Sequence, residues 1–435
     1  MGIDVEKRQI TKLAGASGDP CRPGGRLGSP HLLTGEAVRS TFFASKFSAE
    51  ESRCPVSERA SQGRDLARTA ILATLGQSGP LSRSDLARRL DLSPATVTQV
   101  TRRLLEHGMV EELERVPSRG GRPAQLLGLV GSAGRAVGVK IAPDHAVAVV
   151  VRLDGELLEE RETSLDAAAP DCLDRVAALL RPLTSGETRL LGVGVGVPGV
   201  VDSPDGGIVE APTLGWAGTP VGARLRDLLR LPVLVDNDVN TLAVAERLYG
   251  RGRAHRDFLV VTVGLGIGLA IIVDGGLLRG SRGGAGEFGH LPVADGPRCA
   301  CGNNGCLEAV IGSQGLLDAA RARGLARPDA AVFAEAGAML GRAVAGLVNI
   351  LDPAAVLVLG EGTRDWDQWR PGFDPAFHAH LFRSGDRVPV EVDPWDDSRW
   401  AQGAAALVLG TPFDVAPGTG EQGDLVLARL EGRLG

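Results

Sequence analysis

The sequence is poor in cysteine and has no long apolar run. Its 435 residues include six cysteines, too few for a disulfide scaffold, and Cys21, Cys54 and Cys172 are scattered. No uninterrupted apolar stretch approaches the roughly 18–20 residues that cross a bilayer. The N-terminus, with Asp4 and Glu6, lacks the charged-then-apolar layout of a signal peptide. A disulfide-stapled secreted domain and a membrane protein are therefore excluded, and we expect a cytoplasmic protein.

Length and charge predict several domains of unlike character. A chain of 435 residues, 43% of them hydrophobic, favours two or three domains with real cores. The net charge of −6 divides into +2 over residues 1–60, +3 over 61–130 and −11 over the remainder. A small basic segment before a large acidic body often marks a nucleic-acid-binding module. Residues 1–60, rich in Gly, Ser and Pro, predict a disordered extension, and residues 411–435 a C-terminal tail.

Residues 61–130 predict a winged helix-turn-helix domain. A helical pattern begins at Asp65, and Ser82 then caps a short second helix. Ser93-Pro94 opens a third helix, with serine as N-cap and proline at the first helical position. Two strand-like runs, 109–112 and 125–129, flank a Gly- and Arg-rich tip at 117–123 that is typical of a wing.

The third helix separates an apolar from a polar face. At 100° per residue Val97, Val100, Leu104 and Leu105 share one side, which leaves small and basic side chains on the other. Such a face suits a DNA major groove, and arginines on the wing suit phosphate or the minor groove. The predicted DNA-contacting residues are Ser93, Ala95, Thr96, Gln99, Arg102, Arg103, Arg119 and Arg122. The alternative is a small helical protein-interaction domain with a solvated arginine face.

Residues 134–410 alternate β and α patterns and predict an α/β body of two lobes. The expected strands are 136–141, 146–153, 190–197, 233–235, 258–263, 269–273 and 356–359, and the expected helices are 173–183, 240–248, 334–350 and 400–409. Glycines alternate at Gly192, Gly194 and Gly196, which leaves one face of that strand bare. Another element or a ligand can therefore approach this face closely.

Three cysteines and one histidine lie within a short Gly-rich segment. His290, Cys299, Cys301 and Cys306 match a four-coordinate Cys₃His site, and a closed set of four protein ligands indicates one structural zinc per chain. The alternatives are reduced, buried cysteines beside an unrelated histidine, or a disulfide, which the cytoplasm disfavours.

Carboxylates and amides cluster beside two loops. Asp236-Asn237-Asp238 ends a predicted strand and starts a helix, while Glu287 and Glu308 flank the cysteine loop. Ionised oxygens accept hydrogen bonds from adjacent hydroxyls, as a polyol ligand requires, although Asp and Asn at such a junction are also ordinary helix caps. The Gly264–Gly268 hairpin is a weak candidate for a phosphate cradle.

Together these motifs resemble the ROK family (repressors, open reading frames and kinases), specifically its winged-helix regulators of the xylose-repressor and N-acetylglucosamine-repressor kind. The resemblance spans about 61–410 and implies a two-lobed, actin-like sugar-kinase body with a ribonuclease H-like fold. It implies that the sugar-contacting residues are Asn237, Asp238, Glu287, His290 and Glu308, and that the zinc ligands are His290, Cys299, Cys301 and Cys306. The sugar contact of His290 would then use the ring nitrogen that does not bind zinc.

Departures from the family pattern favour a regulator over a kinase. Family kinases place an Asp-x-Gly-Gly-Thr phosphate loop after the first strand, where this chain has Lys140 in place of the acid and Pro143 in place of a backbone donor. Leu265 replaces a threonine of the second loop, and Thr213 replaces the usual asparagine before Leu214. Asp238, the general base of family kinases, is retained, and we interpret it as an acceptor of sugar hydroxyls.

The sequence therefore predicts a non-enzymatic, DNA-binding transcriptional regulator, a repressor of carbohydrate genes acting as a homodimer or homotetramer. Its partners are double-stranded operator DNA and a sugar or sugar-phosphate effector, with no membrane. One rival is an ATP-dependent ROK sugar kinase with an appended DNA-binding domain. Another is a zinc-dependent scaffold whose body binds a protein.

Overall fold

The computed structural model describes residues 67–432 apart from 69, 77, 117–122, 187–188, 383–387, 394, 397 and 414–419. All of these lie in Pro55–Gly435, one of the two units into which the chain divides. The predicted extension 1–60 and the predicted wing residues Arg119 and Arg122 lie outside the described residues.

The N-terminal part of this unit is a helix-turn-helix with a small antiparallel sheet. After a helical stretch over 70–76, its elements are β1 (Leu81–Ser82), α2 (Arg83–Leu90), α3 (Pro94–Glu106), β2 (Val110–Val116) and β3 (Ala124–Leu129). β3 pairs with both β1 and β2. The predicted caps are confirmed, because Ser82 Oγ accepts from Asp85 N and Ser93 Oγ accepts from Thr96 N, each at 3.1 Å.

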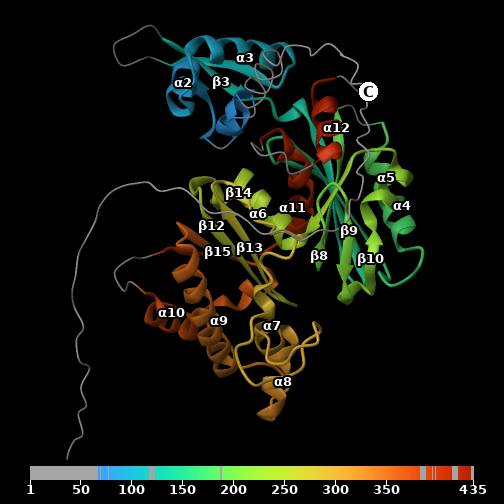
Figure 1. Cartoon of the computed structure of the whole chain (residues 1–435), viewed down its shortest axis with the longest axis vertical. Coiled ribbons are helices and arrows are strands. Elements are labelled where there is room, and N and C mark those ends of the chain that lie inside the picture. The colour runs from blue at the N-terminus through green and yellow to red at the C-terminus, as the bar shows by residue number, and fades with distance from the viewer. Residues whose placement is uncertain are drawn as a thin grey trace, which may run out of the picture. The chain divides into compact units, whose positions relative to one another are not determined.

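The first lobe of the body is a five-stranded sheet in the order β11-β7-β4-β5-β6. Its strands are β4 (Arg135–Ile141), β5 (His145–Arg152), β6 (Leu157–Ser164), β7 (Leu190–Val197) and β11 (Val233–Asn237). Helices α4 (Cys172–Thr184) and α5 (Val221–Leu229) cover one face, and α11 (Ser398–Leu409) the other (Figure 1). A small sheet follows β7, formed by β8 (Val200–Val201), β9 (Ile208–Ala211) and β10 (Trp216–Pro220), with the short helical turn η2 (Pro212–Leu214) between β9 and β10. Another such turn, η1 (Gly131–Ala133), precedes β4.

The bare glycine face of β7 receives a helix. A Cβ on Gly194 would overlap the carbonyl oxygen of Ala404, and a Cβ on Gly138 of β4 would overlap that of Ala401. Both carbonyls belong to α11, so the backbone of α11 lies directly on the sheet. The glycine alternation therefore serves close packing of a helix in the core.

The second lobe is a five-stranded sheet in the order β14-β13-β12-β15-β16. Its elements are β12 (Phe258–Val263), β13 (Ile267–Val273), β14 (Gly276–Leu277), β15 (Ala355–Leu359), β16 (Val390–Val392), α7 (Leu307–Ile311), α8 (Ser313–Ala322), α9 (Ala330–Leu351), α10 (Trp366–His380), η4 (Phe288–His290) and η5 (Glu361–Asp365). Helix α6 (Asp238–Leu248), followed by η3 (Arg251–Ala254), packs on one face of this sheet and also against α11. The two-lobed α/β body is thus confirmed.

Helix α10 is not among the predicted helices, and it contains Pro371 and Pro375, a residue type that disfavours helix interiors. Tertiary packing overrides that preference. The aromatic rings of α10 are buried against α9, and Gly337 of α9 allows the backbone of Trp369 to approach without a Cβ in the way.

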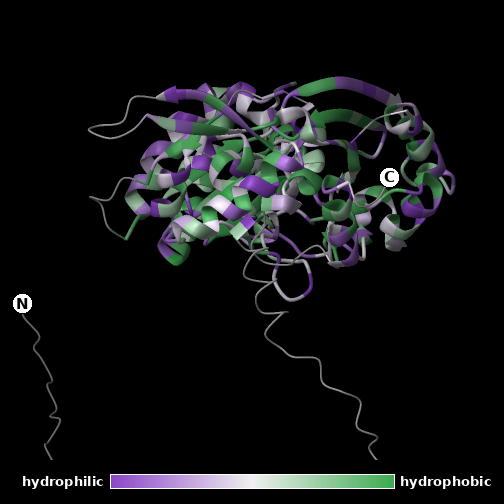
Figure 2. Ribbon diagram, turned by 90° about the horizontal axis from the view of Figure 1, so that it is seen from above, coloured by the Kyte–Doolittle hydropathy of each residue, from purple (hydrophilic) through white to green (hydrophobic). Residues whose placement is uncertain are grey.

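Helix α9 is long and apolar enough to cross a membrane by length and composition alone. Half of its most apolar window is nevertheless buried in the second lobe, where Leu340 and Val344 are fully covered. The apolar residues of α9 therefore form part of the core of the second lobe. Figure 2 shows hydrophobic residues along the ribbons in the interior of the body.

The C-terminal segment, expected only as a tail, contains η6 (Thr411–Phe413) and α12 (Gly420–Leu430). Val426 is fully buried in the core shared with α11, and Gln422 N donates to Asp205 Oδ1 at 2.8 Å. These contacts fasten the end of the chain to the first lobe.

Candidate ligand cleft, metal cluster and nucleic-acid interface

A cavity of about 200 Å³ opens where β11 passes into α6. Its wall is completed by β13, by the loop 283–287 and by the cysteine loop. The five residues predicted to contact sugar all line it: Asn237, Asp238, Glu287, His290 and Glu308. Thr213 and Asn240 line it as well. The parallel pairing of β11 with β7 directs the carboxyl ends of these strands, and the residues after them, toward one edge.

Asn237 serves as the N-cap of α6. Its Oδ1 accepts from Val239 N at 2.9 Å and from Asn240 N at 3.3 Å, and its Nδ2 donates to Gly199 O at 2.9 Å. The helix-cap interpretation of this residue is therefore confirmed, although its side chain still lines the cavity. One Nδ2 hydrogen remains for a ligand, since an amide nitrogen carries two.

Asp238 is held by a lysine from another strand. Lys140, at the carboxyl end of β4, forms an ion pair with Asp238 Oδ2, and its ammonium lies 4.8 Å from the ring centroid of Trp400. Burial lowers the pKa of Lys140 to about 7, and the nearby carboxylate of Glu361 opposes this shift. The position where family kinases are expected to carry an acid thus supplies the counter-charge of Asp238.

Asp236 fixes a loop of the second lobe at the cavity. Its Oδ2 accepts from Arg279 Nε at 2.7 Å, and its Oδ1 accepts from Asn240 Nδ2 at 3.0 Å. Asp236 is buried, and the ion pair compensates for the cost of removing its charge from water.

Two glutamates form the opposite wall. Glu308 Oε2 accepts from Ile267 N at 3.1 Å, so the carboxylate is positioned by the backbone of β13. Burial raises the pKa of Glu287, while His290 opposes this shift and Glu308 adds to it. Glu287 Oε2 lies 3.5 Å from His290 Nε2.

The four predicted metal ligands come together. The ligand atoms of His290, Cys299, Cys301 and Cys306 all lie within 4.8 Å of one another, a set that could hold a metal ion. His290 Nδ1 lies 3.4 Å from Cys299 Sγ, while its Nε2 faces Glu287. One ring nitrogen therefore faces the cluster and the other faces the cavity wall.

Local backbone geometry lets the cysteine loop fold back. Gly302 and Gly305 have φ angles of +92° and +69°, which favour glycine. Cys299 N donates to Asn303 O at 2.7 Å, and Arg298 and Asn304 form an antiparallel bridge. The thiols of Cys301 and Cys306 are thereby placed 3.6 Å apart.

In each of the two loops that would bind phosphate in a kinase, a backbone donor is already engaged. In the first, Ala142 N donates to His145 O at 2.9 Å and closes the β4–β5 hairpin. In the second, Leu265 N donates to Glu361 Oε1 at 2.8 Å, so a carboxylate lies where a phosphate oxygen would accept. A Cβ on Gly264 would overlap that carboxylate.

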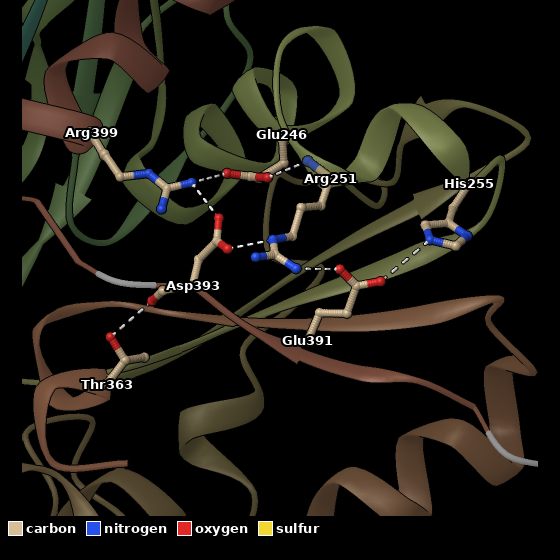
Figure 3. Close-up of polar contacts among 7 residues, drawn as sticks. All are labelled: Glu246, Arg251, His255, Thr363, Glu391, Asp393 and Arg399. Carbon is tan, nitrogen blue, oxygen red and sulfur yellow. Dashed lines mark hydrogen bonds and ion pairs between the residues drawn. The ribbon is translucent and has the colours of Figure 1, made fainter. Parts of the chain in front are cut away.

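The far end of α6 joins an ion-pair network, shown in Figure 3. Glu246 pairs with Arg399 of α11, and Arg399 Nη2 lies 3.2 Å from Asp393, which follows β16. Arg251 of η3 pairs with Asp393 and, at 2.9 Å, with Glu391 of β16. The network ties α6 to both lobes.

The predicted DNA-reading face of α3 is open to solvent. Ala95, Gln99, Arg102 and Arg103 are exposed, while Val97, Val100 and Leu104 are buried. Leu105, predicted with the apolar side, is only half-buried. Arg102 lies 3.5 Å from Glu106 on the same helix, a contact between exposed side chains that competes little with phosphate.

Sequence reasoning does not find Lys140, Arg279 and Glu361 as residues that hold groups around the cavity from outside its lining. Lys140 is one of four lysines, and the sequence shows it only as a departure from the family pattern. Its register partner on β7 is Gly196, which also faces Asp236 of β11. Only the strand order reveals this row, because nothing in the sequence places β4 beside β7.

Comparison with known proteins follows the same division of the chain. Residues 136–411 match the ROK family, and residues 66–116 match the MarR family. The chain is 30% identical over 254 residues to the xylose repressor of Caldicellulosiruptor bescii, covering 57% of this chain and 64% of that protein. It is 28% identical over 253 residues to the xylose repressor of Bacillus subtilis, again over 57% of this chain and 66% of the relative. These alignments span just under two thirds of either repressor.

A longer alignment and two solved structures extend the comparison. The chain is 27% identical over 376 residues to the DNA-binding transcriptional dual regulator NagC of Escherichia coli, covering 79% of this chain and 92% of that protein. A ROK family transcriptional regulator, a homolog of the E. coli MLC protein, superposes with a TM-score of 0.70 at 23% identity over 85% of this chain and 100% of that structure, which shows the fold. A ROK glucokinase from Streptomyces griseus, solved with glucose and AMPPNP, superposes over 63% of this chain and 99% of that structure with a TM-score of 0.56 at 26% identity.

Proposed function

We propose a function for this chain, which belongs to the ROK family. It is a DNA-binding transcriptional repressor of carbohydrate uptake or metabolism genes. A sugar or sugar phosphate is its effector. The observation that carries the proposal is one chain combining an exposed basic α3 face with a carboxylate-lined cavity of about 200 Å³. The names of the relatives, xylose repressor and transcriptional regulator, support it.

The connection between the two sites supports an effector role. Helix α6 begins in the cavity at Asp238 and is followed by η3, where Arg253 Nη2 donates to Gly76 O of the helix-turn-helix part at 2.6 Å. Arg68 of the first helical stretch forms an ion pair with Glu431 after α12. An effector acts only through different affinities for two states, and these contacts can differ between them.

Phosphoryl transfer is not part of the proposal. Ala142 N and Leu265 N already donate to internal oxygens, and Lys140 pairs with Asp238; these contacts disfavour phosphate binding in the cleft. The kinase alternative predicts ADP release with common hexoses that clearly exceeds an Asp238→Asn control. We expect both proteins to give only background.

The Cys₃His cluster fits a structural zinc. Three thiolates and one imidazole form a closed tetrahedral set that leaves no position for substrate. His290 would join this set to the cavity wall, so that zinc would keep Glu287 and His290 in place. We further propose cytoplasmic location and a homodimer or homotetramer, since two winged helices would read an operator with two half-sites.

The test is operator binding by the full chain. Fluorescence anisotropy should show preference for the gene's own upstream DNA over a random duplex, with affinity falling as salt rises. Equal affinity for both duplexes at every salt concentration would refute the proposal. Release of the operator by another protein, with no response to any sugar, would favour the scaffold alternative.

A further inference from the structure

We propose that the cavity selects a sugar without an anionic group and rejects the corresponding phosphate ester. This inference rests on the proposed function, because it takes a carbohydrate as the effector and narrows its chemical class. It is carried by the charges around the cavity and by the internal partners of four nearby backbone N–H groups.

The charged side chains that line the cavity are acidic. Three carboxylates face it, those of Asp238, Glu287 and Glu308. Among the described residues of the lining, none is Lys or Arg. Carboxylates accept from sugar hydroxyls, whereas they repel a phosphate dianion, which proteins usually bind with arginine, lysine or free backbone N–H groups.

Two cations beside the cavity are already paired with carboxylates. Lys140 pairs with Asp238, and the Nε of Arg279 donates to Asp236 Oδ2 at 2.7 Å. A phosphate that recruited either cation would leave a buried carboxylate without its counter-charge, and this cost would offset the gain.

The backbone donors are engaged in the same way. At the N-terminus of α6, Val239 N and Asn240 N donate to Asn237 Oδ1, although a free helix N-terminus attracts anions. Across the cleft, Leu265 N donates to Glu361 and Ile267 N donates to Glu308. Internal oxygens therefore occupy these four N–H groups.

Within this arrangement Lys140 and Glu361 determine the preference for a free sugar over its phosphate ester. Lys140 neutralises the charge of Asp238, so the carboxylate remains a hydrogen-bond acceptor. Glu361 accepts the hydrogen bond from Leu265 N in the second loop. Glu361 is not among the residues that line the cavity, so its carboxylate can be changed without removing a sugar contact.

The experiment measures affinities of the full chain by isothermal titration for three matched pairs. These are D-xylose and xylose 5-phosphate, D-glucose and glucose 6-phosphate, and N-acetylglucosamine and its 6-phosphate. We expect at least one free sugar to bind at least about tenfold more tightly than its ester. Glu361→Ala, which removes the oxygen that accepts from Leu265 N, should lower this ratio severalfold by strengthening binding of the ester.

Other outcomes contradict the inference in distinguishable ways. Equal or tighter binding of a phosphate ester would overturn it and leave a sugar-responsive repressor intact. An unchanged ratio in Glu361→Ala would overturn the part assigned to that carboxylate. If none of the six compounds bound or altered operator affinity, the carbohydrate effector of the proposed function would fail together with the inference.

Discussion

Lys140, at the end of β4, forms an ion pair with Asp238, in the first turn of α6, although the two residues lie 98 positions apart. Their side chains are only 13% and 11% exposed, so the pair is a buried one. It joins the first strand of the body to the helix that begins in the ligand cavity.

Breaking this pair from one side should destabilise the fold. Lys140→Met leaves a buried carboxylate without a counter-charge, and we expect the free energy of unfolding to fall by about 3 kcal/mol. Adding Asp238→Asn should recover much of that loss. Urea unfolding of the two single variants and the double variant measures the coupling, and strictly additive losses would contradict a paired buried charge.

Loss of two thiols should remove the metal. Metal analysis of the purified chain should give one zinc per chain, and none after Cys301→Ser/Cys306→Ser. Cys172→Ser is the matched control, because Cys172 is buried in the core of the first lobe, apart from the cluster. Undiminished zinc in the double variant would remove the assignment.

Arginines on α3 should contribute to DNA affinity through contacts with the phosphate groups of the DNA backbone. Arg102→Ala and Arg103→Ala should each weaken binding to specific and random duplexes alike and reduce the salt slope by about one. Arg161→Ala, on β6 of the first lobe, should change neither quantity. Gln99→Ala should instead relax base preference, which a panel of single-base operator variants would show.

The glycines of the first-lobe sheet that pack beneath α11 should not tolerate replacement by alanine. Gly194→Ala should cost at least about 1–3 kcal/mol, because the added Cβ overlaps the Ala404 carbonyl oxygen of the helix backbone. Gly346→Ala in α9 is the control, since nothing lies within 4 Å of its Cβ position. Thermal unfolding should show this variant unchanged or stabilised by up to about 1 kcal/mol.

The stability that Glu246 contributes should change with pH in a defined direction. Burial raises the pKa of Glu246 above its ordinary 4.5, and Arg399 opposes the shift. The folded chain therefore binds this proton more tightly than the unfolded chain, and the stability it contributes declines as pH rises above about 4.5.

Glu246→Gln lacks this titration. Its stability loss relative to the unaltered chain should therefore be smaller at about pH 7.5 than at about pH 5. Denaturant unfolding at the two pH values, with the exposed Glu335→Gln as control, measures the difference. A loss that grew with pH would contradict the direction of the shift.

Local signals in the sequence determined most elements of the fold. Ser82 and Ser93-Pro94 fix two helix starts through caps, and the strands 190–197 and 258–263 are found at the predicted residues because apolar β-branched runs favour buried strands. The Cys₃His cluster was also predictable, because its four residues lie within seventeen consecutive residues that one short loop can bring together.

Only the tertiary structure decided which residues far apart in the sequence are in contact. The sequence left open whether the glycine face of β7 receives a helix or a ligand, and α11 occupies it. It gave no sign that Lys140 meets Asp238 or that Glu361 fills the second loop, because these contacts depend on strand order and on the two lobes facing each other across the cleft. A sequence records which charges a chain carries, whereas only the packed fold decides which of them neutralise one another and which remain for a ligand.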